Sequence, residues 1–429
     1  MLAYSHKLWS ELSSQISKSM GDTDTYMTVY GTDRKQAEKH ISMYSEMKDL
    51  ASLGDFNAKK SIIDHYVNLM SSGKFGDMDS RISRIINFEN LLDNDDRLIF
   101  ELLLENRALS TIIDRYNIEN VLDSKLLRKI LEEEEKSSSI SKSYNEINKR
   151  MHFASALIYA AEYGQDCIDS LQHQDINEIG VIGKEYIYIV YKGRKIHLAF
   201  LYFENSGAII NIQKKTTQNS SLNYDRQNPI VISAKNNSSR ISVAGYDVTP
   251  TDNDLYYNER IFNLKRISLE DLVDRYRTID KQICTLLTLN QRGKGSFLVT
   301  GSDMGVGKST FLLAMIEKYP DFWGIGVLDP QNEMQVGKKY PAKNVITLVE
   351  NSKKNMAECF DYLLKTSRDI MLVSEITMPE EVTEMVNSAL RLNAGIGATL
   401  HSYLVVTHNH TNATSTIISA YRRLYNKLR

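Results

Sequence analysis

The stretch that most constrains this chain is residues 297–319, which read FLVTGSDMGVGKSTFLLAMIEKY. A short apolar run suits a buried strand, a loop with three glycines follows, and a run of good helix formers begins after Lys308 and Ser309. Strand, glycine-rich loop, Lys-Ser and helix in this order predict a phosphate-binding P-loop. Glycines let backbone N–H groups surround an anion, and the helix N-terminus adds its own unpaired N–H groups. Lys308 would then reach the β- and γ-phosphates of a nucleotide, and the Ser309 hydroxyl would bind Mg²⁺.

The spacing of this loop departs by one residue from the usual pattern. In G-x-x-x-x-G-K-[ST] the first glycine falls on Ser302 of this chain, and Gly301 lies one place further back. Either the loop carries one extra residue, or Ser302 occupies a position that favours glycine. An ordinary glycine-rich turn with an incidental lysine is the competing interpretation, and Gly-Lys-Ser between a strand and a helix weighs against it. The expected phosphate-binding residues are Gly301, Ser302, Gly305, Val306, Gly307, Lys308, Ser309 and Thr310.

Length and composition are those of an ordinary soluble protein. The chain has 429 residues, enough for two or three domains, with 42% hydrophobic residues, 25% charged residues and a net charge of −2. This charge gives no overall attraction to nucleic acid, and no interleaved basic and aromatic runs occur, which weighs against a nucleic-acid partner. Three cysteines far apart in the sequence suit a reducing cytoplasm. We expect neither a signal peptide nor a membrane span, because no apolar run approaches ~20 residues.

Three regions are expected along the chain. Residues 1–150 are polar with helical periodicity and predict a helical N-terminal extension, either a small domain that packs on itself or a docking surface for a partner. Residues 151–267 contain a helix and then strands in hairpins, with a turn at Lys192-Gly193-Arg194 and a return strand over residues 196–203, and predict an α+β N-domain. Residues 268–429 begin with a capping-box pattern at Ser268 and Asp271 and then alternate strands with helices, one of them over residues 379–392. This alternation predicts a parallel, doubly wound sheet that carries the P-loop. The expected fold class is therefore α/β.

Polar residues end the predicted strands of the P-loop domain. Asp329, Glu375 and His401 each follow or close an apolar run. Ligands of parallel α/β sheets bind beyond the carboxyl ends of the strands, where these three side chains are expected to lie. Glu375 could hold the Mg²⁺ water shell or polarise an attacking water, and Asp329 and Glu333 are candidates to orient water. A solvated strand end, an acidic turn around Pro330 and a structural histidine are the competing interpretations.

Further segments resemble a known family, the hexameric secretion ATPases of type II and type IV secretion and type IV pilus systems. The resemblance covers residues 175–401 and is closest to the branch that serves conjugation and tight-adherence pili. DINEIGVIGKEYIYIVYKGR resembles the opening of the family's N-domain, and RISVAGYDVTP with ERIF resembles its arginine-bearing segment. LDPQNEM resembles its acidic box, DIMLVSEI its Walker B stretch and GATLHS its histidine box. Several boxes in the right order are far more specific than a P-loop alone.

The resemblance implies a cytoplasmic ring, usually a hexamer, at the inner face of the cell membrane. Its RecA-like P-loop domain would hydrolyse ATP to drive secretion, conjugation or pilus assembly through an inner-membrane partner. ATP and Mg²⁺ would be the cofactors, with Ser309 and Glu375 at the metal. Glu375 would be the Walker B glutamate, Asp329 would stand for a glutamate that acts on water, and two N-domain arginines would reach the nucleotide. The expected catalytic residues are Glu375, Asp329, Glu333, His401, Arg240 and Arg260.

Some positions depart from the family pattern. Ser374 replaces the glycine that usually precedes the Walker B glutamate, and Thr377 replaces the arginine that usually follows it. Residues 402–429 do not resemble the family's closing segment, so we expect an apparently truncated P-loop domain with weaker assembly and lower ATPase activity than a full-length relative. The first alternative function is a nucleotide-binding assembly subunit that does not hydrolyse ATP. The second is a nucleic-acid translocase.

Overall fold

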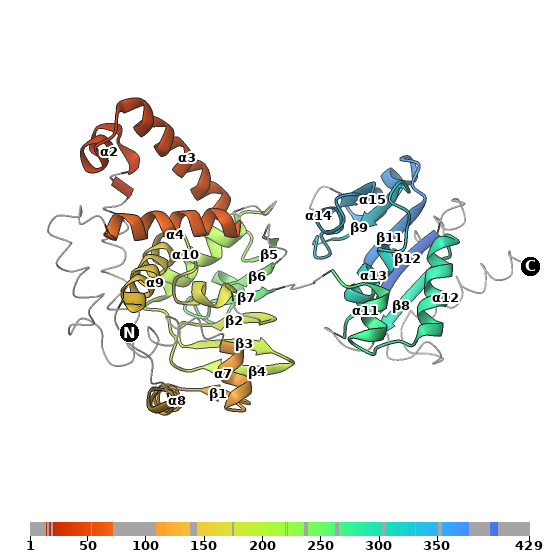
Figure 1. Cartoon of the computed structure of the whole chain (residues 1–429), viewed down its shortest axis with the longest axis horizontal. Coiled ribbons are helices and arrows are strands. Elements are labelled where there is room, and N and C mark those ends of the chain that lie inside the picture. The colour runs from red at the N-terminus through yellow and green to blue at the C-terminus, as the bar shows by residue number, and fades with distance from the viewer. Residues whose placement is uncertain are drawn as a thin grey trace, which may run out of the picture. The chain divides into compact units, whose positions relative to one another are not determined.

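The computed structural model forms two compact units, Met1–Phe262 and Asn263–Arg429 (Figure 1). It describes residues 14, 17–18, 20–52, 54–71, 109–137, 144–173, 176–218, 220, 222–235, 239–261, 266–301, 306–330, 332–350, 354–376 and 395–401. Over these ranges, no helix is both long and apolar enough to cross a membrane. The expected division of the chain at residues 150 and 267 stays a prediction.

Four helices of the first unit share one core. They are α2 (Thr23–Tyr30), α3 (Arg34–Ser52), α4 (Phe56–Ser71) and α9 (Tyr144–Glu162). The Asp22 side chain accepts a hydrogen bond from the Thr25 N–H at 2.9 Å and begins α2, and Gly31 ends it with a φ of 64°. In the shared core the Tyr44 and Tyr66 hydroxyls lie 2.9 Å apart. Burial of these apolar faces stabilises the helices, because tertiary packing supplies most of a helix's stability in a folded protein.

A seven-stranded sheet completes the first unit, in the order β1-β4-β3-β2-β7-β6-β5. Its strands are β1 (Val121–Leu122), β2 (Glu178–Ile182), β3 (Tyr186–Tyr191), β4 (Arg194–Leu198), β5 (Ile230–Ala234), β6 (Arg240–Ala244) and β7 (Tyr256–Arg260). All neighbours are antiparallel except the parallel pair of β1 and β4. The predicted hairpin is present, since Lys192 and Gly193 adopt φ of 48° and 78° between β3 and β4. The predicted extent of the return strand, residues 196–203, is wrong, because a turn from Leu198 to Leu201 ends β4.

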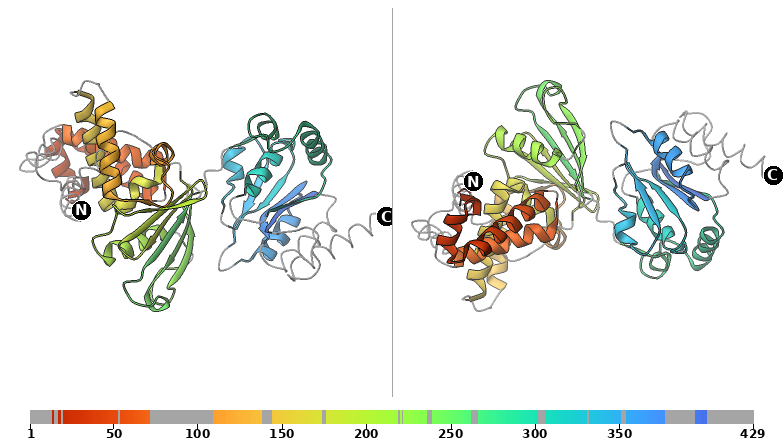
Figure 2. Two further views of the ribbon diagram at one scale, coloured as in Figure 1. Left: turned by 90° about the horizontal axis from the view of Figure 1, so that it is seen from below. Right: turned by 90° about the horizontal axis from the view of Figure 1, so that it is seen from above.

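The two faces of this sheet are unequal. One face packs against α7 (Leu109–Arg115), α8 (Ser124–Ser137), the 3₁₀-helix η2 (Asp166–His173) and α10 (Ser206–Thr217), and its isoleucines are fully buried. Figure 2 shows α10 lying along this side of the sheet. On the other face Tyr186, Ile230 and Ile232 are 44%, 58% and 54% exposed. Such alternation is typical of an antiparallel sheet that has one packed face and one accessible face.

A five-stranded parallel sheet forms the centre of the second unit, in the order β10-β9-β11-β12-β8. Its strands are β8 (Phe297–Gly301), β9 (Ile325–Leu328), β10 (Val345–Leu348), β11 (Ile370–Ile376) and β12 (Gly395–His401). Its described helices are α11 (Leu269–Asp274), α12 (Lys281–Arg292), α13 (Lys308–Ile316), α14 (Val336–Lys339) and α15 (Met356–Leu364). Ile370 and Leu372 of β11 pack with α13 and α14, whereas Met371 and Val373 pack with α15. The predicted α/β class, with a parallel sheet covered on both faces, is confirmed.

Local sequence signals in this unit have mixed outcomes. The predicted capping box begins α11, where the Ser268 hydroxyl and the Asp271 carboxylate each accept the other residue's backbone N–H. Strand β10 was not predicted, because its four residues do not alternate between apolar and polar side chains. The helix expected over residues 379–392, Thr377 and the expectations for residues 402–429 all lie outside the described residues.

Candidate nucleotide-binding site

The glycine-rich segment joins β8 to α13 and places Lys308 in the first turn of that helix. Gly307 adopts φ 96° and ψ 12° at the N-cap position, a left-handed conformation that favours glycine. The Phe311 N–H donates to the Gly307 carbonyl at 2.9 Å and closes the first turn. The side chains of Lys308 and of the two residues that follow it are partly exposed. The N–H groups of a helix's first turn and a lysine beside them are the elements that bind a phosphate group. Ser302 and Gly305 lie outside the described residues.

Gly301 ends β8, and the side chains of Val306 and Lys308 lie close to it. A Cβ atom on Gly301 would stand 2.8 Å from Val306 Cγ2 and 3.3 Å from Lys308 Cγ. The first distance is shorter than real Cβ contacts, so a side chain at 301 would require the Val306 side chain to move. The steric requirement gives a physical reason for a glycine at 301, one place before the usual position. The residues present therefore fit the cradle that a phosphate group needs.

The strand register brings the predicted acidic residues and the histidine to one edge of the sheet. His401 pairs with Gly301 at the carboxyl ends of β12 and β8. Leu328 of β9 pairs with Val373 of β11. Asp329, which follows Leu328, therefore lies level with Ser374 and Glu375, which follow Val373. All five strands are parallel, and this edge is where α13 begins. The arrangement agrees with a ligand site beyond the carboxyl ends of the strands.

A β-bulge in β11 sets the position of Glu375. The register with β12 runs regularly to Val373 and resumes at Ile376, so two residues of β11 lie opposite Thr399. The Thr399 hydroxyl donates to the Ser374 carbonyl, and Glu375 is partly exposed between buried neighbours. Bulges of this kind redirect side chains and are frequent next to active sites.

Asp329 is a buried carboxylate held by backbone donors. Asp329 is only 1% exposed, and its Oδ2 accepts a hydrogen bond from the Met334 N–H at 2.8 Å. Burial raises the pKa of Asp329, and this effect outweighs the hydrogen bonds from the loop backbone and from the Ser374 side chain. Nearby, burial lowers the pKa of Lys339 to about 8, although the negative charge of Asp329 acts to raise it. A carboxylate with a raised pKa is a stronger base than an exposed one.

The two predicted arginines lie in the first unit and are brought together there. Arg240 begins β6 and Arg260 ends β7, and the two residues are directly paired across the antiparallel ladder. Glu178 of β2 pairs with Arg260 from the other side. Residues paired in this way project from the same face of the sheet. That face is the accessible one. Contact between these arginines and the P-loop stays a prediction.

Sequence reasoning did not identify three groups that shape this site. Ser374, which departs from the family pattern, acts to lower the pKa of Asp329 against the effect of burial, and the Thr399 hydroxyl donates to the Ser374 carbonyl within the bulge. Lys339 donates to the Met334 carbonyl at 2.6 Å and closes the loop that carries Glu333. None has a spacing signal, because each acts through a partner distant in sequence or through a loop of irregular backbone. Within the described ranges, no three His, Cys, Asp or Glu side chains gather as a metal site.

This chain is similar to several solved structures. No family model and no curated protein matches it. Similar solved structures include the VirB11 ATPase of the Brucella suis type IV secretion system in complex with sulphate (14% identity, TM-score 0.26, 55% of this chain and 76% of that chain covered). The Legionella pneumophila ATPase DotB is also similar (16%, 0.41, 57% and 70%), as is the pilus retraction motor PilT with bound ADP (15%, 0.40, 57% and 71%). These proteins are of the kind that the sequence boxes resemble. Similarity at this level assigns no activity to the chain.

Proposed function

We propose that this chain binds ATP with Mg²⁺ at the carboxyl edge of the parallel sheet and hydrolyses it as a motor for secretion, conjugation or pilus assembly. The observation that carries the proposal is the geometry of the glycine-rich segment. Gly307 in the left-handed conformation starts α13, Lys308 lies in its first turn, and the side chains of Val306 and Lys308 lie close to Gly301 at the end of β8. Two carboxylate residues, Asp329 and Glu375, end or follow neighbouring strands at the same edge.

Each group has a distinct role in the proposed reaction. Lys308 and the N–H groups of the first turn of α13 would bind the phosphates. Bound Mg²⁺ would offset phosphate charge, with Ser309 and Glu375 as the protein groups that hold it or its water shell. Asp329 would orient the attacking water, and its raised pKa favours proton acceptance. Glu333 and His401 would complete the proposed set.

Further parts of the proposal concern the first unit and the assembly. Arg240 and Arg260 would reach the nucleotide and neutralise charge that develops on the phosphates. The chain would form a ring, as a hexamer, and act in the cytoplasm on an inner-membrane platform protein. The accessible face of the first unit's sheet supports self-association, because Ile230 and Ile232 are more than half exposed on it.

Steady-state phosphate release by the full chain tests the proposal. Lys308→Ala is expected to lower turnover about a hundredfold or more, because it removes a preorganised cation from the phosphates. The matched control is Lys365→Ala, since this exposed lysine pairs with Asp361 at the end of α15, next to the amino edge of the sheet. Wild-type turnover in Lys308→Ala would refute the P-loop assignment. ATP binding without turnover in the wild-type chain would instead support the non-hydrolysing assembly subunit.

A further inference from the structure

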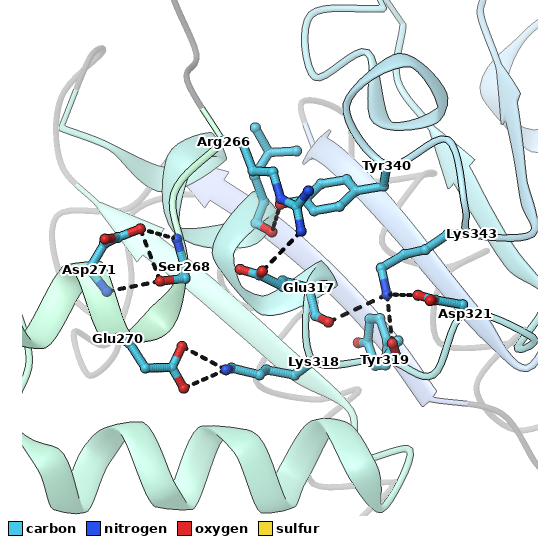
Figure 3. A network of polar contacts seen from close by, with 11 residues as sticks. Arg266, Ser268, Glu270, Asp271, Glu317, Lys318, Tyr319, Asp321, Tyr340 and Lys343 are labelled. Atoms are coloured by element: carbon cyan, nitrogen blue, oxygen red, sulfur yellow. Dashed lines mark hydrogen bonds and ion pairs between the residues drawn. The ribbon is translucent and has the colours of Figure 1, made fainter.

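Arg266 contacts two separate elements of the second unit (Figure 3). Its Nη2 lies 3.1 Å from Glu317 Oε1, and its guanidinium carbon lies 4.9 Å from the centre of the Tyr340 ring. Glu317 follows the last residue of α13, the helix that begins with Lys308. Tyr340 follows α14, which ends the loop that begins at Asp329. One side chain therefore contacts the distal ends of both elements that form the proposed site.

Tyr340 is also hydrogen-bonded directly to α13. The Tyr340 hydroxyl donates to the Leu313 carbonyl at 2.9 Å, and Tyr340 is only 3% exposed. Burial and the nearby charge of Glu317 raise the pKa of Tyr340 to about 12, so its hydroxyl remains a donor at neutral pH. Leu313 and its neighbours in α13 are fully buried, so the helix is firmly packed.

Tyr340 is connected to Asp329 through its neighbour Lys339 and two hydrogen bonds at Met334. Lys339, beside Tyr340, donates to the Met334 carbonyl, and the Met334 N–H donates to Asp329 at 2.8 Å. The backbone of Tyr340 is itself held by a hydrogen bond to the Val336 carbonyl at 2.9 Å. A shift of Tyr340 away from α13 would therefore move the loop that holds the Asp329 carboxylate.

We propose that Arg266 is a positioning residue, which holds the Asp329 loop against the P-loop helix by bridging Tyr340 and Glu317. The inference rests on the proposed function for its effect on hydrolysis, and on geometry alone for its effect on the loop. Because Lys308 lies on a firmly packed helix, loss of Arg266 is expected to leave nucleotide affinity unchanged. Because Asp329 depends on the loop, the same loss is expected to lower kcat.

The test compares Arg266→Gln with Lys318→Gln in the full chain. Lys318, two residues after the end of α13, forms an ion pair of the same kind with Glu270 of α11 at 2.5 Å, and this ion pair does not involve Tyr340. Arg266→Gln is expected to lower kcat about threefold to tenfold, from the loss of one exposed ion pair and one cation–π contact, with the Kd for ATP unchanged. Arg266→Lys, which keeps the charge, is expected to restore part of the loss.

Hydrogen exchange gives a second readout that does not depend on hydrolysis. In the nucleotide-free protein, the amides of Met334 and Tyr340 are expected to exchange about threefold to tenfold faster in Arg266→Gln and unchanged in Lys318→Gln. Unchanged exchange in Arg266→Gln, or an equal rise in both variants, would overturn the inference. A wild-type chain that neither binds nor hydrolyses ATP would refute the proposed function, and the exchange comparison would still decide whether Arg266 holds the loop.

Discussion

Replacement of Gly307 by alanine gives the sharpest measure of the loop conformation. At φ 96° the backbone is left-handed, and an added Cβ would meet no atom within 4 Å. The cost is therefore conformational rather than steric, and a left-handed non-glycine residue costs about 1–2 kcal/mol. If the loop of Gly307→Ala leaves the left-handed conformation in the free protein, the conformational cost appears when nucleotide binding restores that conformation. In either case the nucleotide-saturated protein loses that stability relative to the unfolded chain.

Calorimetric unfolding with saturating ADP and Mg²⁺ measures this loss. For a unit of this size, 1 kcal/mol corresponds to about 2–4 °C, so the Tm of the second unit is expected to fall by roughly 2–8 °C in Gly307→Ala. Gly307→Asn is expected to lose less, because asparagine tolerates the left-handed region better. The matched control is Gly337→Ala in α14, which also has open space but no positive φ, and should gain about 0.4–1 kcal/mol. A Tm for Gly307→Ala equal to that of Gly337→Ala would refute the reasoning.

Three further predictions concern the catalytic groups. Glu375→Gln is expected to bind ATP within about threefold of wild type, because only the charge of the side chain is lost. It is expected to hydrolyse ATP about a hundredfold more slowly in phosphate-release assays. Equal losses of binding and turnover would indicate a structural role. Asp329→Asn is expected to be at least as stable as wild type in urea unfolding at neutral pH, because the raised pKa of the buried carboxylate means that its ionisation opposes folding. This advantage should shrink as the pH falls toward the ordinary aspartate range, and an advantage that grew on acidification would contradict the sign of the shift. Arg240→Ala and Arg260→Ala are each expected to lower kcat about tenfold or more with little change in Tm, and unchanged kinetics in both would remove them from the site.

The elements with strong local signals were predicted from the sequence. Strand β8, helix α13 and the capping box at Ser268 each follow from patterns within a few residues of one another. Buried parallel strands such as β11 were recognisable as continuous apolar runs, because helices cover both faces of the sheet. Strand β10 escaped prediction because its side chains are only half-buried and its partner, β9, is supplied by the fold.

The parts of the site that could not be predicted depend on tertiary contacts. The bulge opposite Thr399 arises from pairing between two strands, and nothing in the local sequence around Glu375 specifies the extra residue. The burial that raises the pKa of Asp329 is likewise a property of the packed loop. Arg266 could not be singled out because Glu317 and Tyr340 lie far from it in the chain. Pairing of Arg240 with Arg260 also required the register of β6 and β7.

The central claim is a nucleotide site built on the glycine-rich segment, and a calorimetric titration of the full chain with ATP and Mg²⁺ tests it most directly. The wild-type chain is expected to show saturable binding of one nucleotide per chain. Lys308→Ala is expected to bind at least about tenfold more weakly, because a charge-assisted contact to phosphate is lost. Absence of saturable binding by the wild-type chain, or the same affinity in both proteins, would contradict the claim.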